Sequence, residues 1–317
     1  MSAQRFPGTD PPAKFPSTIE PGRRHWAFLD FDEQEIFARV AGGVRRVPFV
    51  TSVYRRALWY KLINEQGRSL RRFGRFVEVS IGDNGILLDL SQMHDFVMFY
   101  DIARGKGYED GTLGLLERTL KSGDTFVDVG ANNGYFSIAA LPHVGESGKV
   151  ISFEPSPSAF LRLTANWNKT GRPANWIIKQ LALGEVSGRA RLFRSPQEDG
   201  QDSLVRAQLT SVEVEVRQLD DELINTCPKL IKVDTEGSEE SVLNGTQNTL
   251  RNCLQTSLII EWNRFSRVEF WNRLWSKFDI SRIPVHSGKP LRRLMPSAPP
   301  QGLCNVLCSP RFKEGRL

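Results

Sequence analysis

The sequence predicts an α/β fold with a doubly wound, mostly parallel sheet. Short apolar runs that resemble buried strands recur along the chain, at 126–129, 150–153, 230–233 and 258–260. Each run ends near an acidic residue, and helical patterns follow the first runs, as in repeated strand–helix units. A glycine-bearing turn follows the first run. These observations place a ligand site at the carboxyl ends of the strands.

The first unit is GDTFVDVGANNGYFS, from Gly123 to Ser137. Asp128 closes the strand, and Gly130 and Gly134 allow the backbone to turn tightly and a ligand to approach closely. Tyr135 then begins an apolar helical run. The unit therefore predicts a binding turn at the end of the strand.

The spacing in this turn separates two cofactor classes. Dinucleotide sites require G-x-G-x-x-G, but Asn132 stands at the second glycine position and Tyr135 at the third. A pyrophosphate therefore fits poorly. A carboxylate at Asp128, beside a glycine turn with an asparagine, suits a cofactor with an amino group and a sulfonium. The turn predicts S-adenosylmethionine.

The next two units predict the adenosine site. In VISFEPSPSAF, Glu154 ends a strand where an acid typically accepts hydrogen bonds from ribose hydroxyls, and Pro155 begins the following turn. In WIIKQLALGEVSG, a strand is expected to end near 181–183, with Ala182 and Leu183 against the adenine.

Acids at the ends of the last parallel strands are the candidate catalytic residues. Asp234 and Glu236 follow the strand in LIKVDTEGSEESVL, and Glu261 closes SLIIEW. Asp234 is the first choice to take a proton from an acceptor hydroxyl. Asp234 and Glu236 also fit the first turn of a helix, where carboxylates cap free amides. Glu261 also fits a structural ion pair with an arginine.

Taken in order, these segments resemble the motifs of the FkbM family of S-adenosylmethionine-dependent methyltransferases, namely VDVGANNGYFS, SFEPSPSAF, LALGEVSG, LIKVDTEGSEESVLNG and LIIEWN. The resemblance covers roughly residues 99–310. It implies a class I methyltransferase (Rossmann-like) fold. FDISRIPV and LCNVLCSP would form its closing hairpin, with an antiparallel last strand.

The resemblance also implies an O-methyltransferase, commonly one that acts on a hydroxyl of a sugar, glycolipid or polyketide-type small molecule. It does not name the acceptor. Two alternatives remain: a module that binds the cofactor without catalysis, and an NAD-linked enzyme. The acids at several strand ends disfavour the first alternative, and the missing second glycine disfavours the other.

The chain is expected to have three parts. Residues 1–24 are rich in proline and form a flexible arm, residues 25–110 form a helical and β-hairpin extension, and residues 111–317 form the methyltransferase domain. FVEVSIGDNGILLDL predicts the hairpin, with its turn around Asp83, Asn84 and Gly85. The polar loop 197–203 lies between two further expected strands and is a candidate lid.

A basic amphipathic pattern occupies residues 55–75, where Arg and Lys alternate with apolar residues and Glu65 is the only acid. It predicts peripheral contact with an anionic membrane or a lipid-linked acceptor; the alternative is a helix packed on the domain with its arginines in water. The formal net charge of +6 is concentrated before the catalytic region. No Asn/Asp-Pro-Pro-Tyr signature of base methylation occurs, so nucleic acid is not an expected partner.

No apolar run approaches the length of a membrane span or a signal peptide, which predicts a cytoplasmic enzyme. Cys304 and Cys308 lie too far apart on one expected strand for a disulfide, and Cys227 and Cys253 are expected to stand alone. The four histidines have no metal-ligand spacing. A reducing compartment and no metal are therefore expected, and His94 is more typical of a packed histidine than of a base.

Overall fold

The computed structural model describes residues 76–82, 84–90, 92–103, 107–194, 202, 204, 210–263, 266–286, 289–300 and 302–311. All of them belong to one compact unit of the chain, residues 55–317. Three predicted segments lie outside the described residues and remain sequence predictions. They are the N-terminal arm, the basic segment 55–75, and the loop 197–203 apart from Asp202.

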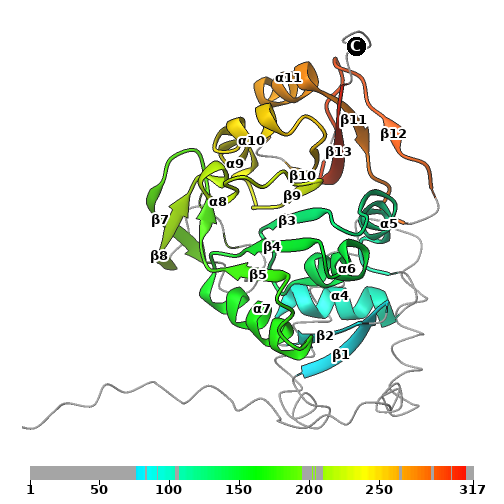
Figure 1. Cartoon of the computed structure of the whole chain (residues 1–317), viewed down its shortest axis with the longest axis vertical. Helices are drawn as coiled ribbons and strands as arrows, with labels where there is room; N and C mark the ends of the chain where they lie inside the picture. The colour runs from blue at the N-terminus through cyan, green and yellow to red at the C-terminus, as the bar shows by residue number, and fades with distance from the viewer. Residues whose placement is uncertain are drawn as a thin grey trace, which may run out of the picture. The chain divides into compact units, whose positions relative to one another are not determined.

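An eight-stranded sheet forms the centre of this unit (Figure 1). In spatial order its strands are β12 (Arg292–Arg293), β11 (Phe278–Arg282), β13 (Cys304–Pro310), β10 (Ser257–Trp262), β9 (Leu230–Val233), β3 (Thr125–Val129), β4 (Lys149–Phe153) and β5 (Trp176–Lys179). The strands from β10 to β5 are parallel, and β13 is antiparallel to both β10 and β11. This order confirms the predicted Rossmann-like sheet with an antiparallel C-terminal strand.

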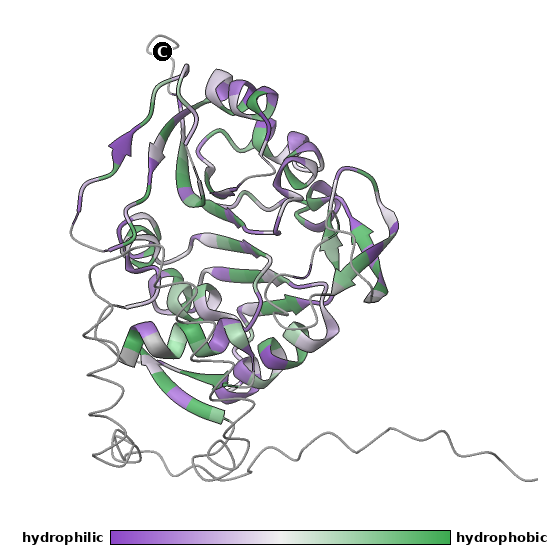
Figure 2. Ribbon diagram, turned by 180° about the vertical axis from the view of Figure 1, so that it is seen from behind, coloured by the Kyte–Doolittle hydropathy of each residue, from purple (hydrophilic) through white to green (hydrophobic). Residues whose placement is uncertain are grey.

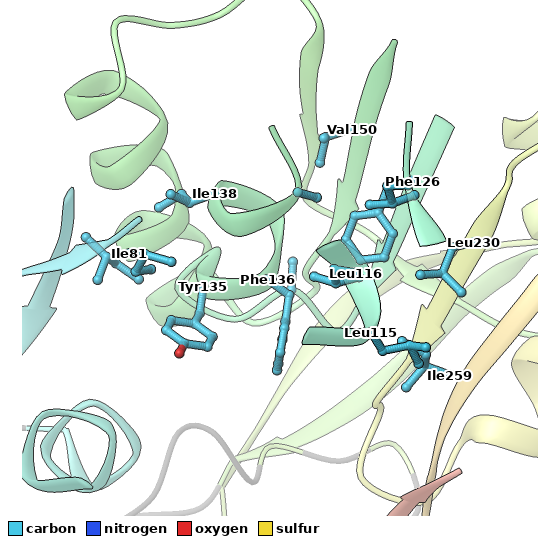
Figure 3. Packing of buried hydrophobic residues seen from close by; sticks show 14 of the residues in the cluster. Ile81, Leu115, Leu116, Phe126, Tyr135, Phe136, Ile138, Val150, Leu230 and Ile259 are labelled. Carbon is cyan, nitrogen blue, oxygen red and sulfur yellow. The ribbon is translucent and has the colours of Figure 1, made fainter. Parts of the chain in front are cut away.

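Helices cover both faces of the sheet. The first face carries α4 (Met93–Ala103), α5 (Asp110–Thr119), α6 (Tyr135–Val144) and α7 (Pro157–Lys169), and the second carries α8 (Leu219–Glu222), α9 (Glu239–Asn244), α10 (Gln247–Asn252) and α11 (Val268–Lys277). Alternation along β3 sends Phe126 to the first core and Val127 and Val129 to the second. Figure 3 shows Phe126 in the first core with Leu116 and Phe136.

Hydropathy follows this layering. Most central strands are hydrophobic in Figure 2, because a parallel sheet with helices on both faces is buried on both sides. The edge strand β12 is hydrophilic and consists of Arg292 and Arg293. Exposed charges on an edge strand oppose pairing with another chain.

The predicted N-terminal hairpin is present as β1 (Phe76–Ile81) and β2 (Asn84–Asp89). Its turn lies between Ile81 and Asn84, so it comes earlier than expected, and Asn84 and Gly85 pair within the ladder. β2 packs against α4, α6 and α7, and Ile86 and Leu88 belong to the first core. The first core therefore contains residues from both sides of position 110, which is the expected boundary between the extension and the methyltransferase domain.

A smaller sheet has the strand order β6 (Ala182–Leu183), β8 (Thr210–Arg217) and β7 (Gly188–Arg194). The expectation of a single strand that ends near 181–183 is wrong, because the structure has two separate strands there. β5 ends at Lys179, and Ala182 leaves the central sheet because it pairs with Val216 of β8. The two other strands expected in this region are confirmed as β7 and β8.

Cys227 and Cys253 form a disulfide, with their Cα atoms 5.3 Å apart. The expectation that they stand alone is wrong, because the fold brings together the segment before β9 and the end of α10. Cys304 and Cys308 are free and lie on β13, as expected. A reducing compartment was expected because the cysteines were expected to be unpaired. The disulfide removes that reason. Within the described part of the chain, no helix combines the length and apolar character needed to cross a membrane.

Candidate functional site

A cavity of about 240 Å³ opens where β3, β4, β9 and β10 end. Ten of the predicted site residues line it: Gly130, Asn132, Tyr135, Glu154, Pro155, Ala182, Leu183, Asp234, Glu236 and Glu261. The lining does not include Asp128 or Gly134. The structure therefore gathers the strand-end residues, as the parallel topology requires.

Asp128 lies behind the cavity wall, because alternation along β3 turns it toward α6. It is 1% exposed, and its Oδ2 accepts a hydrogen bond of 2.6 Å from Ser137 Oγ. Burial raises the pKa of Asp128, and the charge of Lys232 and the Ser137 bond partly offset this. Its Oδ1 has no hydrogen-bond partner within the described part of the chain.

The two glycines are required by the packing of the chain itself. Gly130 has φ +80°, and a Cβ there would lie 1.8 Å from the carbonyl oxygen of Asp234. Gly134 has φ +88°, and a Cβ there would lie 2.8 Å from Leu163. Both values of φ favour glycine. The Cβ position at each glycine is therefore occupied by the protein, while the backbone of Gly130 still lines the cavity.

Glu154 fixes the glycine turn. Its Oε2 accepts the N–H of Asn132 at 2.9 Å, and its Oε1 accepts the N–H of Ser156 at 2.8 Å. Burial raises the pKa of Glu154 to about 7, although these two bonds and the charge of Arg162 oppose the shift. Each carboxylate oxygen retains a lone pair for a ligand hydroxyl.

A buried polar network supports the turn from the N-terminal side. Asn132 Oδ1 accepts a 2.8 Å bond from Arg162 Nη2, and Asn133 Nδ2 donates a 2.9 Å bond to Asp95 Oδ1. Asn166 Nδ2 donates to the carbonyl of Asn133 at 2.8 Å. Asp95, Arg162 and Asn166 were not predicted from the sequence, because their partners in this network lie 30 or more positions away.

Apolar residues form the wall beside Glu154. They are Phe153, Pro155, Leu181, Ala182, Leu183, Leu192 and Leu204. The wall combines the end of β4 with strands β6 and β7 of the smaller sheet and with neighbouring loop residues. It offers a flat aromatic ligand an apolar surface next to a carboxylate.

A buried lysine occupies the other end of the cavity. Lys232 is 2% exposed, and its Nζ lies 2.7 Å from Asp234 Oδ2 and 4.6 Å from the centre of the Phe136 ring. Burial disfavours its charge, but the carboxylates of Asp234, Asp128 and Glu109 outweigh burial and raise the pKa of Lys232. Lys232 was not predicted as a site residue, although a lysine inside the apolar strand LIKV indicates a buried charge with partners.

Glu261 is a neutral acid at neutral pH. Burial, together with the charges of Asp234 and Glu236, raises the pKa of Glu261 to about 9. Its Oε2 accepts a 3.2 Å hydrogen bond from Asn263 Nδ2, so its partner is an amide rather than the arginine considered from the sequence. A protonated Glu261 can donate a hydrogen bond into the cavity.

Glu239 has the capping role that was considered for Asp234 and Glu236. Its Oε1 accepts the N–H groups of Thr235 at 3.0 Å and of Gly237 at 2.9 Å. Asp234 and Glu236 line the cavity instead, and Glu236 has φ +54°. His94 also lines the cavity, and its side chain is 25% exposed.

The sequence model of the methyltransferase FkbM domain matches residues 128–295. Hexuronic acid methyltransferase AglP of Haloferax volcanii is 29% identical over 148 residues, which are 45% of this chain and 58% of that protein. A methyltransferase FkbM from Methylobacillus flagellatus KT has a TM-score of 0.40 at 19% identity, over 58% of this chain and 43% of its own. An S-adenosylmethionine-dependent O-methyltransferase from Thermotoga maritima has a TM-score of 0.37 at 14% identity, over 76% of this chain and 80% of its own.

The family match begins at the strand-end acid Asp128 and includes the glycine turn, Glu154 and the acids at the ends of β9 and β10. It covers more than half of the 317 residues. The family match argues against the alternative of an NAD-linked enzyme. The chain therefore belongs to the family of the methyltransferase FkbM domain.

Proposed function

We propose that this enzyme methylates a hydroxyl group of an uncharged sugar, either free or as part of a glycolipid. The observation that carries the proposal is that one cavity joins two chemically different ends. One end has Glu154 beside an apolar wall, and the other has Asp234, Glu236 and the neutral acid Glu261. The first end suits the cofactor, and the second suits a polyhydroxylated acceptor.

The residues of the first end fit S-adenosylmethionine. Glu154 would accept hydrogen bonds from the ribose hydroxyls, while Pro155, Ala182 and Leu183 would contact the adenine. Ser238 Oγ is buried against the cavity and has no hydrogen-bond partner among the described residues, so a polar ligand atom would satisfy it. S-adenosylmethionine supplies a methyl group on a positively charged sulfur. The surrounding carboxylates favour that charge.

The residues of the second end fit a neutral polyol. Asp234 and Glu236 can accept hydrogen bonds from sugar hydroxyls, and protonated Glu261 can donate one. Lys232 supplies a single buried positive charge, which is already paired with Asp234. An acceptor that carries its own carboxylate would face these acids across a poorly solvated cavity.

The relative from Haloferax volcanii supports a sugar as the acceptor, since its name describes a hexuronic acid methyltransferase. The acids around this cavity favour the uncharged counterpart of such a sugar. The chain would contribute mainly by holding the hydroxyl behind the methyl group in a desolvated site, because orientation alone supplies much of the acceleration.

Matched glycosides test this proposal. Methyl β-D-glucoside and methyl β-D-glucuronide differ only at C6, and octyl glycosides of the same pair imitate a lipid-linked sugar. Release of S-adenosylhomocysteine should be faster with the neutral member of each pair, by at least about tenfold in kcat/KM, which corresponds to about 1.4 kcal/mol. Equal or faster reaction of the glucuronides would contradict the uncharged acceptor. S-adenosylmethionine binding without reaction of any glycoside would contradict the sugar class.

A further inference from the structure

Three side chains form a hydrogen-bonded chain along one side of the cavity. His94 Nδ1 lies 3.4 Å from Asp95 Oδ1, and His94 Nε2 lies 3.2 Å from the hydroxyl of Tyr108. His94 and Tyr108 line the cavity, whereas Asp95 is 0% exposed. A buried carboxylate, an imidazole and a hydroxyl in this order match the arrangement by which a carboxylate orients a histidine base.

Asp95 is held firmly and remains charged. Its Oδ2 accepts the N–H of Asp89 at 2.8 Å, its Oδ1 accepts the amide of Asn133 at 2.9 Å, and Arg162 Nε lies 3.5 Å from Oδ2. Burial alone would raise the pKa of Asp95, but the hydrogen bond with His94 and the charge of Arg162 more than offset it and keep the pKa below its usual value. A carboxylate here accepts Nδ1–H and leaves the Nε2 lone pair toward Tyr108.

Tyr108 is fixed between His94 and the glycine turn. Its ring meets His94 edge to face at 5.7 Å and Tyr135 at 5.4 Å, and its carbonyl accepts the Tyr135 hydroxyl at 2.9 Å. Burial and the charges of Glu109 and Asp234 raise the pKa of Tyr108. The phenol therefore keeps its proton at rest and can pass it on only as it receives another.

The acids at the end of the cavity are less suited to accept a proton at neutral pH. Glu261 is already protonated, because its pKa is about 9, and Asp234 is ion-paired with Lys232 at 2.7 Å. The charged and titratable groups that face His94 are Asp95 on its own helix, Tyr108 and Glu109 before α5, and Arg162 on α7 beside Asp95. Within this set, the imidazole is the base whose Nε2 is hydrogen-bonded to a hydroxyl that lines the cavity.

We propose that His94 is the general base of methyl transfer, that the Tyr108 hydroxyl relays the proton to it, and that Asp95 is its positioning residue. The inference rests on the proposed methylation of a hydroxyl. The acceptor oxygen forms a bond to the methyl carbon as the carbon–sulfur bond breaks and leaves its electron pair on sulfur. The acceptor proton passes to the Tyr108 oxygen while the Tyr108 proton passes to Nε2. The imidazolium then faces the Asp95 carboxylate and releases its proton to water.

His94→Gln and Tyr108→Phe test the relay, with His143→Gln as a matched control at the end of α6 outside the cavity lining. Calorimetry with S-adenosylhomocysteine should give affinities within about threefold of wild type for all three variants. At saturating S-adenosylmethionine, kcat with the methyl and octyl glucosides should fall about 10²- to 10⁴-fold in the first two variants and stay unchanged in the control. A kcat within threefold of wild type in His94→Gln or Tyr108→Phe would overturn the proposal.

The pH profile separates this role from a structural one. In wild type, kcat at saturating cofactor should fall at acid pH, because a general base must be unprotonated to accept the proton of the acceptor. The residual activity of His94→Gln should lack this acid limb. An unchanged acid limb would contradict a histidine base.

A spectroscopic readout needs no acceptor. The chain has four histidines, so the long-range ¹H–¹⁵N signals of His94 can be assigned by their loss in His94→Gln. Neutral His94 should carry its proton on Nδ1, and Asp95→Asn should disturb this preference. A proton on Nε2 would overturn the proposal. If no glycoside reacts but the Nδ1–H form is found, the acceptor class fails while the assignment of the base stands.

Discussion

The carboxylate of Glu154 at the end of β4 accepts the backbone N–H of Asn132 at 2.9 Å, from a residue 22 positions earlier in the glycine turn. The acid expected to hold the ribose therefore also shapes the turn next to it. Arg162 completes the connection, because it donates to the side chain of Asn132 at 2.8 Å. Cofactor binding and the conformation of the turn should respond together to changes at these residues.

Gly130 offers a test of the close approach between β3 and β9. Gly130→Ala should lower the free energy of unfolding by about 1–2 kcal/mol for the positive φ, and by about 2 kcal/mol more because the Asp234 carbonyl must move. Urea unfolding measures this. Gly171→Ala is the matched control, since Gly171 has φ +83° with nothing within 4 Å of the added Cβ. Equal losses in the two variants would show that packing against Asp234 does not matter.

Asn166 tests the connection between the N-terminal hairpin and the glycine turn. Its side chain accepts the N–H of Leu87 and donates to the carbonyls of Leu87 and Asn133. Asn166→Ala leaves these buried groups without partners and should cost about 2–4 kcal/mol of stability. It should also weaken binding of S-adenosylhomocysteine, as measured by calorimetry.

Asn168→Ala on the same helix is the control for Asn166→Ala. Asn168 is exposed and bonds Arg172, so its loss should change stability by no more than about 0.5 kcal/mol. Normal cofactor affinity in Asn166→Ala would show that the hairpin does not support the turn.

Glu261 should make the stability of the enzyme depend on pH. Its carboxyl has an ordinary pKa of 4.5 when unfolded and a pKa of about 9 in the folded protein. The folded state therefore keeps a proton that the unfolded chain loses, and the stability from this group falls as pH rises from about 4.5 to about 9. Glu261→Gln has no ionisable group at this position, so its stability should not fall in this way as pH rises.

Thermal melting at pH 5, 7 and 9 checks the role of Glu261. The melting temperature of Glu261→Gln relative to wild type should increase with pH across this series. Glu146→Gln, on an exposed surface, controls for the loss of a surface charge. A constant difference between Glu261→Gln and wild type would mean that the folded carboxyl is not protonated.

The strands and the strand-end residues could be predicted because they follow from local patterns. Apolar runs predict the strands, alternation predicts their faces, and parallel pairing gathers Glu154, Asp234 and Glu261 at one edge. The hairpin was predictable for the same reason, and only its turn was misplaced. Local patterns do not determine which strand pairs with which, so the separation of β6 from β5 could not be foreseen.

The supporting network depends on contacts that sequence spacing does not encode. Asn166 bonds Leu87 across 79 positions, and Asn133 bonds Asp95 across 38. The Cys227–Cys253 disulfide likewise depends on how α10 packs. Lys232 was the exception, since a lysine within a buried strand is a visible signal. Glu239 was overlooked because Asp234 and Glu236 precede it in the same acidic segment.

Calorimetric titration of S-adenosylhomocysteine into wild type, Glu154→Ala and the surface control Glu146→Ala shows whether Glu154 holds the cofactor. Glu154→Ala should weaken binding by about 1–3 kcal/mol, or about 5- to 150-fold, and the control should match wild type. Wild-type affinity should also fall as pH drops below about 7, where Glu154 takes up a proton, and Glu154→Ala should lose this dependence. Equal affinities of the three proteins at all pH values would mean that Glu154 does not bind the cofactor.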